Sequence, residues 1–131
     1  MNICALSVLS AERGFFTSPA IVICQPWLPD MGFIPGALVQ VLPEAGGIFL
    51  ILCNENIHRY SELLQATEEK KGALITVDYC RNGARVEVDR YCIRNAGLDA
   101  GGRLIAQYEY GFIRVRKLPE PEPLGLVEAE F

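Results

Sequence analysis

The chain repeats part of itself, and this repeat limits its possible folds more than any other sequence feature. Residues 21–53 align without a gap with residues 86–118, at an offset of 65 positions. The aligned glycine pairs are Gly32/Gly97, Gly36/Gly101 and Gly46/Gly111. Because backbone geometry dictates where glycine is needed, the match indicates one backbone unit used twice.

Each copy predicts the same succession of elements. In copy one a short alternating strand (21–23) precedes one helical turn (27–31), which ends at Gly32. A strand (37–42) and a hairpin into a last strand (47–52) follow. Copy two repeats this succession at 86–88, 92–96, 103–108 and 112–117, and a strand-like run precedes each copy, at 3–8 and at 74–79.

Between the copies the sequence predicts one connecting helix, residues 57–71. Asn56 can cap its start, Gly72 ends it, and Ile57, Tyr60, Leu63 and Leu64 share one face. We therefore expect a mainly β fold with one connecting helix. Its expected segments are a first repeat (1–55), the helix (56–72), a second repeat (73–118) and an acidic, proline-rich tail (119–131).

Composition favours a packed domain without a metal or cofactor. The sequence is 50% hydrophobic and 21% charged, and no apolar run reaches the ~20 residues of a membrane helix. With no signal-like N-terminus, a cytoplasmic protein without membrane contact is expected. The five widely spaced cysteines form no C-x-x-C pair and the only histidine is His58, so we expect reduced cysteines and no zinc site.

Charge is divided unevenly along the chain. Residues 1–80 carry four bases and eight acids, residues 81–118 carry eight bases and four acids, and the tail adds four acids. A local basic stretch is the relevant signal for nucleic acid, since phosphate contacts need arginine or lysine. The candidate phosphate-binding residues are Arg81, Arg85, Arg90, Arg94, Arg103, Arg114 and Arg116. The alternative is that these arginines are ordinary solvent-exposed positions on strands and bind nothing.

No catalytic constellation is visible in the sequence. His58 lies on the expected helix, and neither Asp89 and Asp99 nor the Glu68–Glu69 pair has a spacing typical of an acid–base or metal site. The sequence thus favours a binding function over a catalytic one.

The first repeat offers a different function. Residues 48–52 are apolar on both strand faces, so they are either buried on both sides, under the helix at 57–71, or form a surface for a protein partner or self-association. A protein-interaction module is therefore the alternative to nucleic-acid binding.

A family resemblance agrees with the repeat. The residues that carry it in copy one are Pro19, Ala20, Ile21, Ile23, Trp27, Leu28, Gly32, Phe33, Gly36, Val39 and Val41, closing with Gly46, Gly47, Ile48 and Leu50. This run resembles the core of SymE-like toxins, within the AbrB/MazE swapped-hairpin superfamily. Residues 95–104 of copy two are similar to the general AbrB pattern.

The resemblance implies a barrel of two swapped-hairpin units around a twofold axis, with nucleic acid bound on one face. Since one chain supplies both units, we expect an intrachain pseudo-dimeric barrel. SymE-like members are associated with bacterial toxin–antitoxin systems, as nucleic-acid-binding or RNA-cleaving toxins. Copy one has no basic residue and Cys92 replaces the tryptophan in copy two, so contact with DNA or RNA is expected mainly from copy two. The acidic tail is expected to weaken binding by lying over the basic residues.

Overall fold

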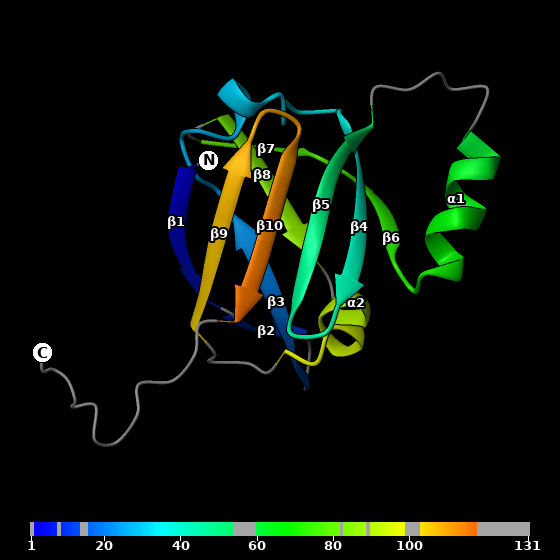
Figure 1. The fold of residues 1–131 in the computed structure, drawn as a ribbon. Coiled ribbons are helices and arrows are strands. Elements are labelled where there is room, and N and C mark those ends of the chain that lie inside the picture. The colour runs from blue at the N-terminus through cyan, green and yellow to red at the C-terminus, as the bar shows by residue number, and fades with distance from the viewer. Residues whose placement is uncertain are drawn as a thin grey trace, which may run out of the picture.

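The strands of the computed structural model form two antiparallel sheets (Figure 1). The structure describes residues 2–7, 9–13, 16–53, 60–81, 83–88, 90–98 and 103–117. The larger sheet has the order β1-β9-β10-β5-β4-β6 and the smaller one β2-β3-β8-β7. The strands are β1 (Asn2–Ser7), β2 (Leu9–Arg13), β3 (Phe16–Ile23), β4 (Leu38–Glu44), β5 (Gly47–Cys53), β6 (Ala73–Thr76), β7 (Asp78–Cys80), β8 (Gly83–Val88), β9 (Arg103–Glu109) and β10 (Phe112–Lys117). The chain is therefore mainly β, as the sequence predicts.

The core lies between the two sheets. Alternate residues of β4, β8, β9 and β10 are buried, as the period of two requires, and the residues at 21, 23, 86 and 88 of the smaller sheet are buried. From the larger sheet the buried side chains include Ile48, Leu50, Ile113 and Val115. The alternation in the sequence therefore predicted the inward-facing residues of β3, β8 and β10 correctly, whereas for β5 the sequence, apolar on both faces, indicated no inward face.

The larger sheet consists mainly of two hairpins, one from each copy. Strands β4 and β5 form the first and β9 and β10 the second, and β5 pairs with β10 between them. The leading strands cross over: β1 pairs with β9 of copy two, and β6 pairs with β4 of copy one. Each copy thus completes the sheet edge of the other copy.

Strand register follows the sequence repeat. Val22 lies opposite Glu87 where β3 meets β8, and Phe49 lies opposite Arg114 where β5 meets β10. Both pairs join residues 65 positions apart, which is the offset of the repeat. Aligned positions therefore occupy corresponding places in both sheets.

The predicted glycine turns are confirmed where the structure describes them. The φ angles of Gly32, Gly36, Gly46, Gly97 and Gly111 are all positive, between 75° and 92°. This left-handed backbone is strained for residues with a Cβ atom, which explains the glycines. The predicted turn at Gly101 lies outside the described residues.

The expected closed barrel is wrong. The run expected as one strand, residues 74–79, is interrupted at Val77, whose N–H and C=O bond to Ala37 and Gly36. Before this residue β6 joins the larger sheet, and after it β7 joins the smaller one. The chain therefore passes between two sheets rather than closing one.

Helix α1 (Tyr60–Glu69) lies within the predicted connecting helix; Asn56, Ile57 and His58 fall outside the described residues. It packs against β6 and β4, at the sheet edge, and not as a cover for residues 48–52. Buried Thr67 donates a hydrogen bond to Leu63 O at 2.6 Å and accepts one from Gln40 Nε2 at 2.8 Å. These bonds satisfy the hydroxyl where the helix meets β4.

Two shorter helical elements lie at opposite ends of the larger sheet (Figure 1). The 3-10 turn η1 (Pro29–Met31) lies beside the β9–β10 turn, where Gly111 N–H bonds to Met31 O at 2.8 Å. Helix α2 (Arg90–Asn95) lies beside the β4–β5 turn, where Gly46 N–H bonds to Ala96 O, also at 2.8 Å. These two bonds join equivalent positions of the two copies.

The expectation that every cysteine is reduced is wrong for one pair. Cys24, after β3, and Cys80, at the end of β7, form a disulfide across 56 positions of sequence. The strands β3 and β7 both pair with β8, which brings distant residues together. In the described part of the chain, no helix is long and apolar enough to span a membrane.

Candidate nucleic-acid interface

Four exposed cations of the second repeat gather at one end of the larger sheet. Lys117 ends β10, Arg116 precedes it, Arg103 begins the neighbouring strand β9, and Arg94 lies in the last turn of α2. Lys117 N–H bonds to Gly46 O at 2.9 Å, and Gly46 N–H bonds to Ala96 O, so strand and helix meet at one turn. We call these four residues the basic end.

A fifth cation from outside the repeat lies beside α2. Asn95 Nδ2 donates a 3.1 Å hydrogen bond to the carbonyl oxygen of Lys71, which follows α1. Lys71 has a φ of +61°, so it takes the left-handed conformation that follows the helix, directly before the predicted helix end at Gly72. At Gly72 a Cβ atom would collide with the carbonyl oxygen of Val41, so glycine is required there for close packing.

The opposite end of the sheet has a different charge. Asp30 in η1 and Glu109 at the end of β9 are both exposed there, next to the β9–β10 turn. Tyr110 at this turn is 69% exposed, whereas its aligned position at the basic end is Ala45. Two ends built from corresponding backbone therefore carry different side chains.

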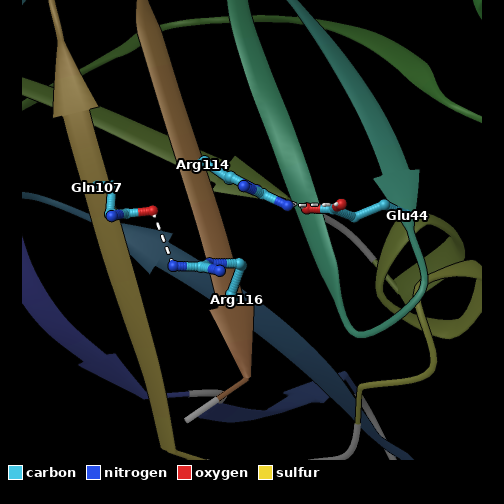
Figure 2. Close-up of polar contacts among 4 residues, drawn as sticks. All are labelled: Glu44, Gln107, Arg114 and Arg116. Atoms are coloured by element: carbon cyan, nitrogen blue, oxygen red, sulfur yellow. Dashed lines mark hydrogen bonds and ion pairs between the residues drawn. The ribbon is translucent and has the colours of Figure 1, made fainter.

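Arg114 is already held by partners within the chain (Figure 2). Its Nε lies 3.0 Å from Glu44 Oε2 and its Nη2 lies 3.2 Å from Glu44 Oε1, and its guanidinium lies 5.1 Å from the centre of the Phe49 ring. The hydrogen bonds to the Glu44 carboxylate raise the pKa of Arg114. Two donors of this guanidinium are therefore already used by Glu44.

Arg116 has more donors to offer than Arg114. Its Nη2 donates one hydrogen bond to Gln107 Oε1 at 3.0 Å on the neighbouring strand (Figure 2). Guanidinium carries five N–H donors, so several remain for an anion after this bond. The bond to Gln107 orients the group along the sheet.

The remaining predicted arginines do not join the basic end as one face. Arg85 lies on the smaller sheet, 3.0 Å from Glu87 Oε1, and Arg81 is exposed after β7. The β7–β8 turn that follows Arg81 contacts Pro29, so Arg81 lies at the end with η1. Arg90 is exposed one turn before Arg94 on α2.

Sequence reasoning missed three contributors to this region. Lys117 was visible in the charge count of the second repeat, but Lys71 lies in another segment and reaches the site only through folding. The contact between Phe49 and Phe112 was also not predicted, because their proximity depends on the pairing of β5 with β10. Among the described residues, no group of three His, Cys, Asp or Glu side chains could hold a metal ion.

Comparisons with known proteins leave the chain unassigned: no family model, no curated protein and no solved structure matches it.

Proposed function

We propose that this protein binds nucleic acid through phosphate contacts made by the basic end. The observation that carries the proposal is the convergence of Arg94, Arg103, Arg116 and Lys117 from three elements on one exposed end. Rigid strands and a packed helix position these cations, and fixed positive groups are what the phosphate backbone recognises. Contact is lopsided, since the opposite end of the sheet carries the exposed Asp30, whose aligned residue at the basic end is the uncharged Asn95.

The proposal extends to the architecture. Register at the 65-residue offset and the crossed leading strands support two swapped-hairpin units that form a pseudo-dimer within one chain. This arrangement is the one implied by the resemblance to SymE-like and AbrB proteins. On that resemblance, the protein is a nucleic-acid-binding component of a bacterial toxin–antitoxin system.

The test compares two matched double variants across a salt series. Arg94→Ala/Arg116→Ala removes two charges from the basic end, and Arg81→Ala/Arg85→Ala removes two from elsewhere in the second repeat. Fluorescence anisotropy with labelled oligonucleotides measures Kd for both and for the unchanged chain. We expect the first variant to bind more weakly, with a flatter dependence of log Kd on log salt, and the control to remain near the unchanged chain.

Two outcomes would contradict the proposal. Equal losses in both variants would mean that net charge, and not the basic end, determines binding. Absence of binding at low salt would discard the nucleic-acid function and favour a protein-interaction module, for which Phe49, Ile51 and Phe112 on the sheet surface are the first residues to test.

A further inference from the structure

We infer that the nucleic acid bound is single-stranded, and that its bases stack on the outer face of the larger sheet. The outer face is the one turned away from the smaller sheet, and its central residues are Phe49 on β5 and Phe112, Arg114 and Arg116 on β10. This inference rests on the proposed function and names its substrate class.

Two aromatic rings lie together on the two central strands. The ring centroids of Phe49 and Phe112 are 5.6 Å apart, with the ring planes tilted by 38°. Both side chains are half-buried, whereas the inward-facing Leu50 and Ile113 of the same strands are fully buried. Aromatic residues on neighbouring strands of an RNA-binding sheet are the usual platform on which unpaired bases stack.

The surroundings of the rings suit a base and its phosphate. The Arg114 guanidinium lies over one face of the Phe49 ring, at 5.1 Å from its centre, and offers its own plane for stacking there. Arg116 and Gln107 lie beside them on β10 and β9, hydrogen-bonded to each other, and supply guanidinium and amide groups. From Phe112 to Arg116 the strand rises by ~13 Å, so stacked bases and the basic end are reached by one short oligonucleotide. Glu44 shares this face, and its carboxylate is neutralised by two bonds from Arg114.

Charge complementarity selects an anionic occupant for this face. It continues at one end into Arg103, Arg116 and Lys117, all exposed, and α1 packs at the β6–β4 side. A duplex keeps its bases stacked inside, where no side chain on a sheet can reach their faces. An unpaired strand presents both base faces and phosphates, so it uses the rings and the cations together.

The repeat explains why apolar side chains and cations lie together on the outer face of the larger sheet. Phe49 corresponds to Arg114, and Ile51 corresponds to Arg116, so copy one supplies apolar groups where copy two supplies cations. Pairing β5 with β10 places these two kinds of side chain alternately on one surface. Neither copy carries both kinds at these two aligned positions.

The experiment measures Kd for a uridine RNA 12-mer, a thymidine DNA 12-mer and a duplex DNA of equal length. The variant Phe49→Leu/Phe112→Leu keeps an apolar surface but removes the rings, and Phe49→Tyr/Phe112→Tyr keeps them. Tyr79→Leu, a change at an 84% exposed ring on the smaller sheet, is the matched control. Thermal melts of each variant verify that the fold is retained.

We expect both single strands to bind more tightly than the duplex. The leucine variant should lose about tenfold in affinity for single strands, and the tyrosine and control variants should lose little. In oligonucleotides that contain 2-aminopurine, stacking should lower the fluorescence on binding, and the leucine variant should abolish this change. A difference between the RNA and DNA arms identifies which of the two is the ligand.

Three results separate failure of this inference from failure of the proposed function. Duplex binding as tight as single-strand binding, with no effect of Phe49→Leu/Phe112→Leu, overturns the stacking face but leaves phosphate contact intact. An equal loss in Tyr79→Leu also overturns it. If no oligonucleotide binds at low salt, the proposed function itself fails.

Discussion

Arg114 lies directly opposite Phe49 in the pairing of β10 with β5, and its guanidinium covers the Phe49 ring at 5.1 Å while two of its nitrogens bond to Glu44. Phe49 and Arg114 occupy aligned positions of the two copies. The contact thus joins one position of the repeat to its own counterpart, with an aromatic ring in one copy and a cation in the other.

Release of Arg114 should strengthen phosphate binding. Glu44→Gln removes the carboxylate that holds the guanidinium and makes one more cation available on the outer face. We expect tighter binding and a steeper plot of log Kd against log salt, by about 0.7 for a single-stranded oligonucleotide. Stability should fall only slightly, because this pair is partly solvent-exposed. Glu69→Gln at the exposed end of α1 is the charge-matched control; the same gain there would point to net charge alone.

Equivalent turn glycines should respond equally to substitution. Gly46 and Gly111 have φ angles of +80° and +76°, and no heavy atom closer than 3.7 Å would meet an added Cβ atom at either one. Alanine at either position should therefore cost about 1–2 kcal/mol in the free energy of unfolding, from backbone strain alone. Urea denaturation of the two variants measures this. A large difference between them would argue against corresponding roles for the two turns.

Gly47→Ala should lower the free energy of unfolding far more than Gly46→Ala or Gly111→Ala. A Cβ atom there would collide with the carbonyl oxygen of Val115 across the β5–β10 pair, where neither strand can move without losing its ladder. We expect a larger drop in urea midpoint than for Gly46→Ala, or loss of folded protein. A drop equal to that of the neighbouring Gly46→Ala would show that the two strands are not so closely paired.

Reduction of the disulfide should destabilise the chain. The Cys24–Cys80 bond closes a long loop between the two halves, and such bonds contribute about 2–4 kcal/mol, mainly by restricting the unfolded chain. Urea midpoints with and without dithiothreitol measure the effect. The variant Cys24→Ser/Cys80→Ser should already be less stable and should no longer respond to the reductant; a continued response would mean that another pair of cysteines is involved.

Docking of α1 depends on one buried hydroxyl. Thr67→Val leaves Gln40 Nε2 without its acceptor and should cost about 1–2 kcal/mol in the free energy of unfolding. Adding Gln40→Leu removes the orphaned donor, and the double variant should recover part of the loss. Thermal or urea unfolding of the single and double variants provides the comparison, and no recovery would indicate that the hydrogen bond is not what Thr67 contributes.

Much of the fold could be predicted from the sequence because local chemistry determines it. Alternation predicted the inward face of β8 and β10, and Gly32, Gly36, Gly46, Gly97 and Gly111 predicted the turns at their positions, since only glycine takes a positive φ without strain. Features that depend on distant segments could not be predicted from the residues alone. Glu44 meets Arg114 across 70 positions and Cys24 meets Cys80 across 56, and nothing in their spacing indicates a partner.

For the candidate site too, the sequence predicted the local feature but not the arrangement that depends on distant segments. A basic second repeat was visible as a charge count, and the candidates it supplied include Arg94, Arg103 and Arg116, which the fold gathers at the basic end. The same count could not separate these from Arg85, whose neighbour on the strand face is Glu87, or from Arg81 at the other end. Which arginines share a surface depends on strand pairing and not on their order in the chain.

The pairing of β1 with β9 joins Asn2 to Tyr108. During synthesis on a ribosome, β1 emerges before the other strands of the larger sheet and must wait for β9, about 100 residues later, before it finds its neighbour. Its backbone donors and acceptors remain unpaired during that interval, and the hairpin of copy one likewise waits for β6 and β10. The larger sheet is therefore completed only after the second repeat has been synthesised, and a ribosome that stalls within the second repeat would leave an incomplete sheet with unpaired edges.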